Sequence, residues 1–176
     1  MQVLVLGIGN ILLQDEGIGV HVVQALRHRY QIPAEVELLD GGTAGMSLLE
    51  DLMNKDHVII IDAVHTGEPP GTVVRLEDEA VPVFLQQRIS PHQLGLSEVL
   101  AALVLADKKP RHLVLIGIVP EKMELSLELT PTIEQKLELL VNGVIAELTA
   151  IGVQLLPLSS ETSVPNRLES PAEEYR

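Results

Sequence analysis

The chain has 176 residues, a length typical of one domain. Its formal net charge of −13 and its aromatic content of 2% argue against a nucleic-acid partner, because phosphates would be repelled and bases would find few rings for stacking. It contains no cysteine, which excludes disulfides, thiolate nucleophiles and cysteine metal ligands and fits a cytoplasmic protein. No apolar run approaches 18 residues and residues 1–7 lack the basic start of a signal peptide, so no membrane association is expected.

Apolar runs alternate with helical patterns along the first half of the chain. The runs 3–6, 35–39 and 57–62 predict strands, and the first and last have the apolar character of strands buried on both faces. An apolar stripe at helical spacing predicts a helix over 16–30, and a shorter stripe predicts another over 46–53. The order is strand, helix, strand, helix, strand.

The second half continues this alternation after a loop that is rich in proline and glycine. Residues 72–76 predict a strand too close to its predecessor for a helical crossover, so we expect an antiparallel strand at a sheet edge. Residues 80–90 are interpreted as irregular. A helix over 94–106, a strand over 112–119 and a final helix over 130–148, which begins with a Thr-Pro cap, complete the pattern.

This order predicts an α/β fold: a three-layer sandwich in which a mostly parallel, twisted sheet of about five strands has helices on both faces. Residues 1–158 are expected to form one domain, and residues 159–176 a disordered acidic tail, because serine, glutamate, proline and arginine replace apolar residues there. Ligands of such folds bind beyond the carboxyl ends of the strands, so the polar residues at those ends are the candidates for function.

Carboxylates and one imidazole follow the predicted strands at these ends. Glu16 lies after the first strand, Asp40 after the second and Asp62 after the third, and His92 precedes the helix over 94–106. Because loops after neighbouring parallel strands converge, Glu16, Asp62 and His92 are expected to meet. Two carboxylates and one imidazole form a plausible three-ligand site for zinc, nickel or another borderline divalent ion.

Structural roles compete with this interpretation. Asp15 and Glu16 start a helix, where carboxylates are common as caps or partners of the helix dipole. Asp40, followed by two glycines, could form a turn, and a single histidine such as His92 is a weak signal. The sequence G-I-G-N after the first strand suggests a nucleotide site, but the third glycine of the fingerprint is absent and two acidic residues stand where a phosphate would bind.

Taken together, several segments of the chain resemble the [NiFe]-hydrogenase maturation endopeptidases. The matching segments occur in the family's order over about residues 1–152. They are 4–12 (LVLGIGNIL), 15–20 (DEGIGV), 39–45 (LDGGTAG), 61–63 (IDA), 90–96 (SPHQLGL) and 117–121 (GIVPE). Several motifs in the right order are far more specific than any one of them alone.

The resemblance implies an activity and a site. Such enzymes remove a short C-terminal peptide from the hydrogenase large-subunit precursor after nickel insertion. The family's metal-binding residues correspond to Glu16, Asp62 and His92, and the aspartate of its D-G-G motif corresponds to Asp40, with a suspected role in cleavage or substrate selection. The implied nickel is that of the precursor, and zinc or cadmium could take its place. The expected partner is this precursor, acted on by a monomer.

Two mechanisms and a second functional class stay open from the sequence. The three ligands either read the nickel held by the precursor or bind a catalytic ion that activates a water molecule. Asp40 or a metal-bound hydroxide is then the candidate base. The alternative class is a non-catalytic metal-binding docking module that checks the same precursor. The absence of cysteine and of a serine motif argues against a covalent acyl-enzyme.

Overall fold

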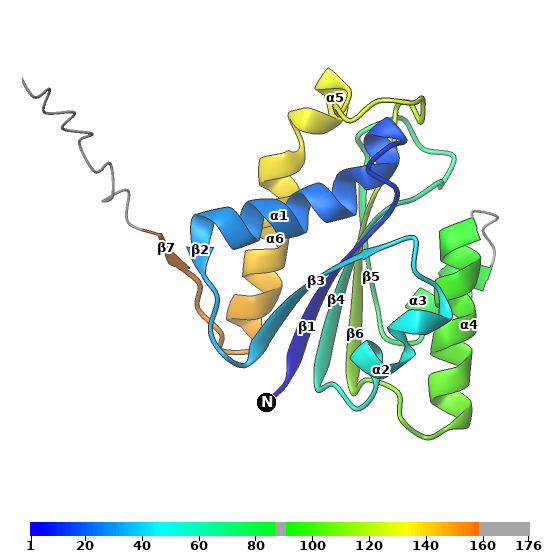
Figure 1. Ribbon diagram of the computed structural model, residues 1–176, viewed down its shortest axis with the longest axis vertical. Coiled ribbons are helices and arrows are strands. Elements are labelled where there is room, and N and C mark those ends of the chain that lie inside the picture. The colour runs from blue at the N-terminus through cyan, green and yellow to red at the C-terminus, as the bar shows by residue number, and fades with distance from the viewer. Residues whose placement is uncertain (87–90, 159–176) are drawn as a thin grey trace, which may run out of the picture.

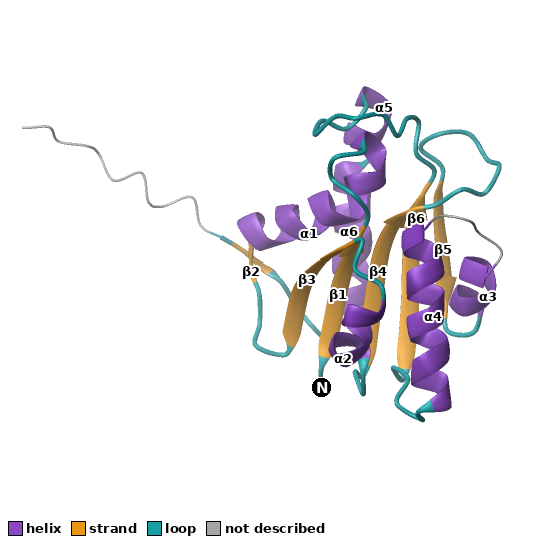
Figure 2. Ribbon diagram, turned by 45° about the vertical axis from the view of Figure 1, so that its right-hand side comes forward, coloured by secondary structure: helices purple, strands orange, loops and turns teal. Residues whose placement is uncertain are grey.

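The computed structural model describes residues 1–86 and 91–158, and for Pro91 and His92 it describes the backbone alone. The expected disordered tail over 159–176 therefore lies outside the described residues. Within them, a five-stranded sheet is covered by helices on both faces (Figures 1 and 2). No helix in these ranges has the length and apolar character needed to cross a membrane.

The central sheet has the strand order β3-β1-β4-β6-β5. Its strands are β1 (Val3–Ile8), β3 (Val36–Gly42), β4 (His57–Ala63), β5 (Val73–Glu77) and β6 (His112–Ile118). The pairs β1–β3, β1–β4 and β4–β6 are parallel, whereas β5 runs antiparallel to β6 at the edge. The expected antiparallel edge strand is confirmed, because the short loop after β4 leaves no room for a crossover helix.

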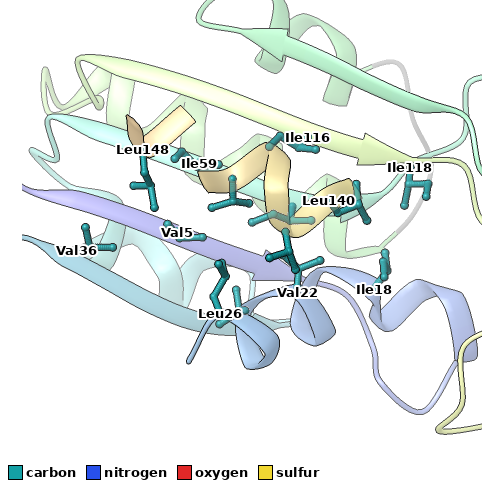
Figure 3. Packing of buried hydrophobic residues seen from close by; sticks show 14 of the residues in the cluster. Val5, Ile18, Val22, Leu26, Val36, Ile59, Ile116, Ile118, Leu140 and Leu148 are labelled. Carbon is teal, nitrogen blue, oxygen red and sulfur yellow. The ribbon is translucent and has the colours of Figure 1, made fainter. Parts of the chain in front are cut away.

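Two helices cover one face of this sheet, namely α1 (Ile18–Arg29) and α6 (Leu137–Ala150). Their buried aliphatic side chains, such as Val22 and Leu140, interlock with Val5, Ile59 and Ile116 of the strands (Figure 3). β-Branched residues on these strands fit a sheet that is buried on both sides.

The opposite face is covered by α2 (Leu49–Leu52), α3 (Ala80–Gln86) and α4 (Pro91–Leu105) (Figure 2). A second cluster of buried aliphatic side chains joins these helices to the alternate residues of the same strands, among them Leu6, Ile60 and Leu115. The two cores together make the three-layer α/β sandwich expected from the sequence.

Several elements differ from the expectation. The helix expected over 46–53 is a 3-10 turn, η2 (Met46–Leu48), followed by the single turn α2. The segment 80–90, expected to be irregular, contains α3, which tolerates Pro82 because the first turn of a helix needs no donated N–H. The final helix is divided into α5 (Pro131–Glu134) and α6.

Two further elements lie outside the predicted pattern. A 3-10 turn, η1 (Gln14–Gly17), precedes α1, and a small antiparallel pair is formed by β2 (Tyr30–Gln31) and β7 (Leu156–Pro157). The pair ties the chain that follows α6 to the end of α1. Two-residue strands carry too few residues for an alternating pattern to reveal them.

Candidate active site at the carboxyl edge of the sheet

The direction of the chain reverses within the sheet at β1. From β1 the chain crosses through α1 to β3 on one side, and from β3 it returns through α2 to β4 on the other side of β1. Neighbouring strands whose connections leave to opposite faces open a crevice at their carboxyl ends, which is where α/β folds bind ligands. The two strands at this point are β1 and β4, and the segments that follow them carry Glu16 and Asp62.

Glu16 lies in η1, half-buried, at the point where the chain turns from β1 into α1. Two glycines allow this turn to lie against the sheet. Gly9 has φ +127°, and a Cβ on it would lie 1.7 Å from the carbonyl oxygen of Glu16. A Cβ on Gly19 would lie 2.2 Å from the carbonyl oxygen of Ile61. These close approaches bring the segment that carries Glu16 to the end of β4. The two glycines are therefore explained by close backbone packing, which leaves no room for a Cβ at either position.

Asp62 is the penultimate residue of β4 and is completely buried. Its side chain points to the face that α4 covers, and Gln93 of α4 donates a hydrogen bond from Nε2 to Asp62 Oδ2 at 3.2 Å. The same Nε2 lies 3.1 Å from the carbonyl oxygen of Ala63. Because a carboxylate is costly to bury without donors, this amide is part of what holds Asp62 inside the protein.

For two of the three predicted metal ligands, Glu16 and Asp62, the structure describes the side chain, and for His92 it describes the backbone alone. Glu16 and Asp62 belong to the two segments that flank the crevice. The backbone of His92 lies in the first turn of α4, next to Gln93 and therefore beside Asp62, but its imidazole lies outside the described residues. Among the side chains that are described, no group of three His, Asp or Glu residues is arranged to hold a metal. The three-ligand site stays a prediction.

Asp40 lies inside β3, whereas the sequence places it after the strand. It pairs with Gly7 in the sheet, and β3 continues to Gly42. Its side chain is exposed, and Oδ1 accepts a hydrogen bond from the Gly42 N–H at 3.0 Å. Since Gly7 pairs with both Asp40 and Ile61, Asp40 shares the face of Ile61 and points away from the face of Asp62.

A shallow pocket of about 230 Å³ lies beside Asp40 at this edge. It is lined by the backbone-rich segment after β1, the start of α1 and the end of β3, through Gly9, Asn10, Ile11, Val20, Asp40, Gly42 and Thr43. The pocket gives Asp40 an open space in which a peptide could approach its carboxylate. The side chains of Asp40 and Asp62 therefore lie on opposite faces of the sheet, at the same carboxyl edge.

Asp15 has a structural role that the sequence does not reveal. It is completely buried, and its carboxylate accepts four hydrogen bonds from the segment after β6. The donors are the N–H groups of Glu121 at 2.9 Å and Lys122 at 3.0 Å, together with the N–H of Thr130 at 2.8 Å and its hydroxyl at 2.9 Å. These partners are more than 100 residues away, so no local spacing could have indicated them. Asp15 fixes the loop after β6 against η1.

Three other histidines have distinct surroundings. His21 of α1 is half-buried, and burial lowers its pKa. His57 and His112 stand at the starts of β4 and β6, with stacked rings whose centroids are 4.9 Å apart. They are at the opposite end of the strands from Asp62.

Comparison with known proteins agrees with this architecture. A family profile described as hydrogenase maturation protease (HycI) matches residues 20–147. The hydrogenase 2 maturation protease of Escherichia coli K12 is 51% identical over 158 residues, which are 89% of this chain and 96% of that protein. The hydrogenase expression/formation protein HupD of Thiocapsa roseopersicina is 42% identical over 156 residues, which are 82% of this chain and 71% of that protein.

Solved structures show the same relationship. The E. coli hydrogenase maturating endopeptidase HybD superposes with a TM-score of 0.88 at 51% identity, covering 90% of this chain and 99% of HybD. The [NiFe] hydrogenase maturation protease HybD of Thermococcus kodakarensis gives 0.68 at 28% identity, covering 85% and 99%. The resemblance and the fold class expected from the sequence are confirmed. With the family profile spanning most of the chain, the protein belongs to the hydrogenase maturation protease family.

Proposed function

We propose that this endopeptidase removes a C-terminal peptide from the large-subunit precursor of a [NiFe]-hydrogenase once nickel has been inserted. Its membership of a family of hydrogenase maturation proteases supports the reaction class and the kind of substrate. The observation that carries the site is the buried Asp62 at the carboxyl edge of β4, hydrogen-bonded to Gln93 beside His92. A carboxylate held in this way where α/β folds bind ligands indicates a functional group.

Glu16, Asp62 and His92 engage the nickel of the precursor in this proposal. Two carboxylate groups and one imidazole are donors that suit nickel, and zinc or cadmium accepts the same set. The half-buried position of Glu16 and the complete burial of Asp62 fit this role, because a cation offsets the cost of burying negative charge. The protease thereby distinguishes a loaded precursor from an empty one, with nickel being part of the substrate.

Asp40 is the proposed catalytic group. As a carboxylate in an open pocket, it can accept a proton from a water molecule that attacks the scissile carbonyl, and then return that proton to the amine that leaves. The C–N bond breaks and a new C–O bond forms, with no covalent link to the enzyme. The chain has no cysteine, so a thiol nucleophile plays no part. The proposal includes a monomer that acts in the cytoplasm.

Processing of a purified, nickel-loaded precursor tests the proposal. Wild-type protein should shorten the precursor at one position, and Asp40→Asn should bind it but leave it intact. His92→Ala should lose processing while keeping the fold, which circular dichroism and the melting temperature would show. A precursor that binds to the wild type and is never cut would instead indicate the non-catalytic docking module. Normal cleavage by His92→Ala would show that the proposed ligand set is wrong.

A further inference from the structure

Five large apolar side chains are exposed on two adjoining loops at the carboxyl edge of the sheet, although such residues usually lie inside. They come from the loop after β1 and the loop after β6, and we call them the apolar platform. Its members, with their exposed fractions, are Ile11 (37%), Leu12 (52%), Met123 (44%), Leu125 (84%) and Leu127 (62%). Single exposed leucines are common on protein surfaces, but a contiguous apolar group indicates an interaction site.

Backbone hydrogen bonds join the two loops of the platform. Ser126 donates its N–H to the carbonyl oxygen of Leu12 at 3.0 Å and accepts the Gln14 N–H at 3.0 Å. Leu13 and Ser126 form an isolated parallel bridge, and Asp15 secures the loop further along. The apolar side chains are thus displayed on an ordered backbone, so a partner would not have to pay the entropy of ordering the loops.

The platform is continuous with the candidate active site. Ile11 lines the pocket beside Asp40, and Leu12 lies two residues before η1, the turn that carries Glu16. Figure 1 shows the loop after β6 next to the end of β1, on the same edge of the sheet. A polypeptide whose cleavage site lies beside Asp40 can therefore reach the platform.

Charge defines the chemistry of the partner. The segment that displays Met123, Leu125 and Leu127 also contains exposed Glu121, Glu124 and Glu128, with Lys122 as the one basic residue between 121 and 129. The whole chain has a formal net charge of −13. An apolar surface framed by carboxylates complements a segment that combines aliphatic residues with lysine or arginine.

We propose that the apolar platform docks an aliphatic and basic segment of the hydrogenase large-subunit precursor next to the peptide bond to be cut. This assignment rests on the proposed function and deepens it, because it names a surface that selects the substrate. The platform supplies affinity through burial of its leucines, and the surrounding carboxylates supply orientation and specificity. Neither group takes part in the bond-breaking step.

The test compares the kinetics of precursor cleavage by wild-type protein, by the double variant Leu125→Ser/Leu127→Ser and by Leu105→Ser. Leu105 is 89% exposed at the far end of α4 and is the matched control. The double variant should raise KM for the nickel-loaded precursor at least tenfold and change kcat less than twofold, and the control should change neither. Leu12→Ser, on the other loop, should raise KM in the same direction and provides a second variant if the first folds poorly.

A charge test complements the apolar one. Glu124→Gln/Glu128→Gln should weaken the dependence of KM on salt concentration, because fewer ionic contacts are then screened. If wild-type protein cleaves the precursor and both apolar variants keep its KM within twofold, the docking proposal is wrong while the proposed function stands. If wild-type protein fails to cleave, the proposed function itself is wrong. A wild-type dimer in sedimentation that the double variant dissociates would overturn the proposal and assign the platform to a second copy of the chain.

Discussion

The side chain of Gln93 links the start of α4 to the end of β4 by donating to Asp62 Oδ2 at 3.2 Å and to the carbonyl oxygen of Ala63 at 3.1 Å. This amide therefore helps to hold a buried carboxylate and joins it to the helical turn to which His92 belongs. This arrangement makes Asp62 a sensitive probe of function, because its charge can be removed without changing its shape.

Asp62→Asn should abolish processing while leaving the fold intact. Asparagine keeps an oxygen that can accept the hydrogen bond from Gln93, but it loses the negative charge that the proposed metal engagement needs. We expect cleavage of the precursor to fall at least a hundredfold, with a melting temperature within a few degrees of the wild type (about 1 kcal/mol). Asp107→Asn, at an exposed position outside the site, is the control. Normal cleavage of the precursor by Asp62→Asn would show that Asp62 has no role in the site.

Asp15→Ala should destabilise the protein strongly. The change leaves four donors of Glu121, Lys122 and Thr130 without their acceptor, and hydrogen bonds to a charged group each contribute about 1.5–3 kcal/mol. We expect a loss of about 3 kcal/mol or more in the free energy of unfolding, measured by urea denaturation. Glu124→Ala, at an exposed position in the same loop, should change it by less than about 0.5 kcal/mol. Equal effects of the two changes would contradict the bracing role of Asp15.

Gly19→Ala and Gly143→Ala should shift stability in opposite directions. A Cβ on Gly19 meets the carbonyl oxygens of Ile61 and Ile8 at 2.2 and 2.5 Å, so α1 would have to move away from the sheet. We expect a loss of at least about 2 kcal/mol, by analogy with overpacked cores. In α6, a Cβ on Gly143 meets the Ile116 side chain at an ordinary 3.5 Å, and alanine should stabilise the helix by up to about 1 kcal/mol. In thermal melts, the melting temperature should fall for Gly19→Ala and rise for Gly143→Ala.

Stability should fall as the pH drops below about 6.5, the ordinary pKa of histidine. Burial and the neighbouring His112 lower the pKa of His57, against the opposing influence of Asp56 and Asp78. The unfolded chain therefore binds a proton at a higher pH than the folded one, and this contribution to stability is lost as the pH falls through the lowered pKa. His57→Gln should reduce the decrease in melting temperature between pH 7.5 and 5. An unchanged or steeper decrease in melting temperature would contradict the prediction that protonation of His57 destabilises the folded protein.

The sequence predicted the parts of this protein that depend on local pattern. The buried strands β1, β4 and β6 were evident from continuous aliphatic runs, and the short connection before β5 predicted its antiparallel direction. Because the strands were expected to be parallel, the loops that follow them, with Glu16 and Asp62, were expected at one edge of the sheet. Local pattern failed for α3, which lies in the segment 80–90 that the sequence indicates as irregular, and for the small pair β2–β7, which depends on a distant partner.

Features of the site that depend on tertiary contacts were not predictable. The four donors to Asp15 come from a loop that lies far away in sequence, and the amide that holds Asp62 belongs to a helix 31 residues further on. Asp40 was placed after its strand because D-G-G is typical of a turn, yet pairing with β1 extends β3 to Gly42. Sequence pattern located the site, and long-range hydrogen bonds determine its geometry.

The most direct test of the central claim is the mass of a purified hydrogenase large-subunit precursor after incubation with this protein, measured for nickel-loaded and nickel-free precursor. We predict loss of one discrete C-terminal peptide from the nickel-loaded precursor and an unchanged mass for the nickel-free one. An intact nickel-loaded precursor, despite measurable binding, would contradict the assignment as its processing endopeptidase. Equal cleavage of both forms would contradict the reading of nickel by Glu16, Asp62 and His92.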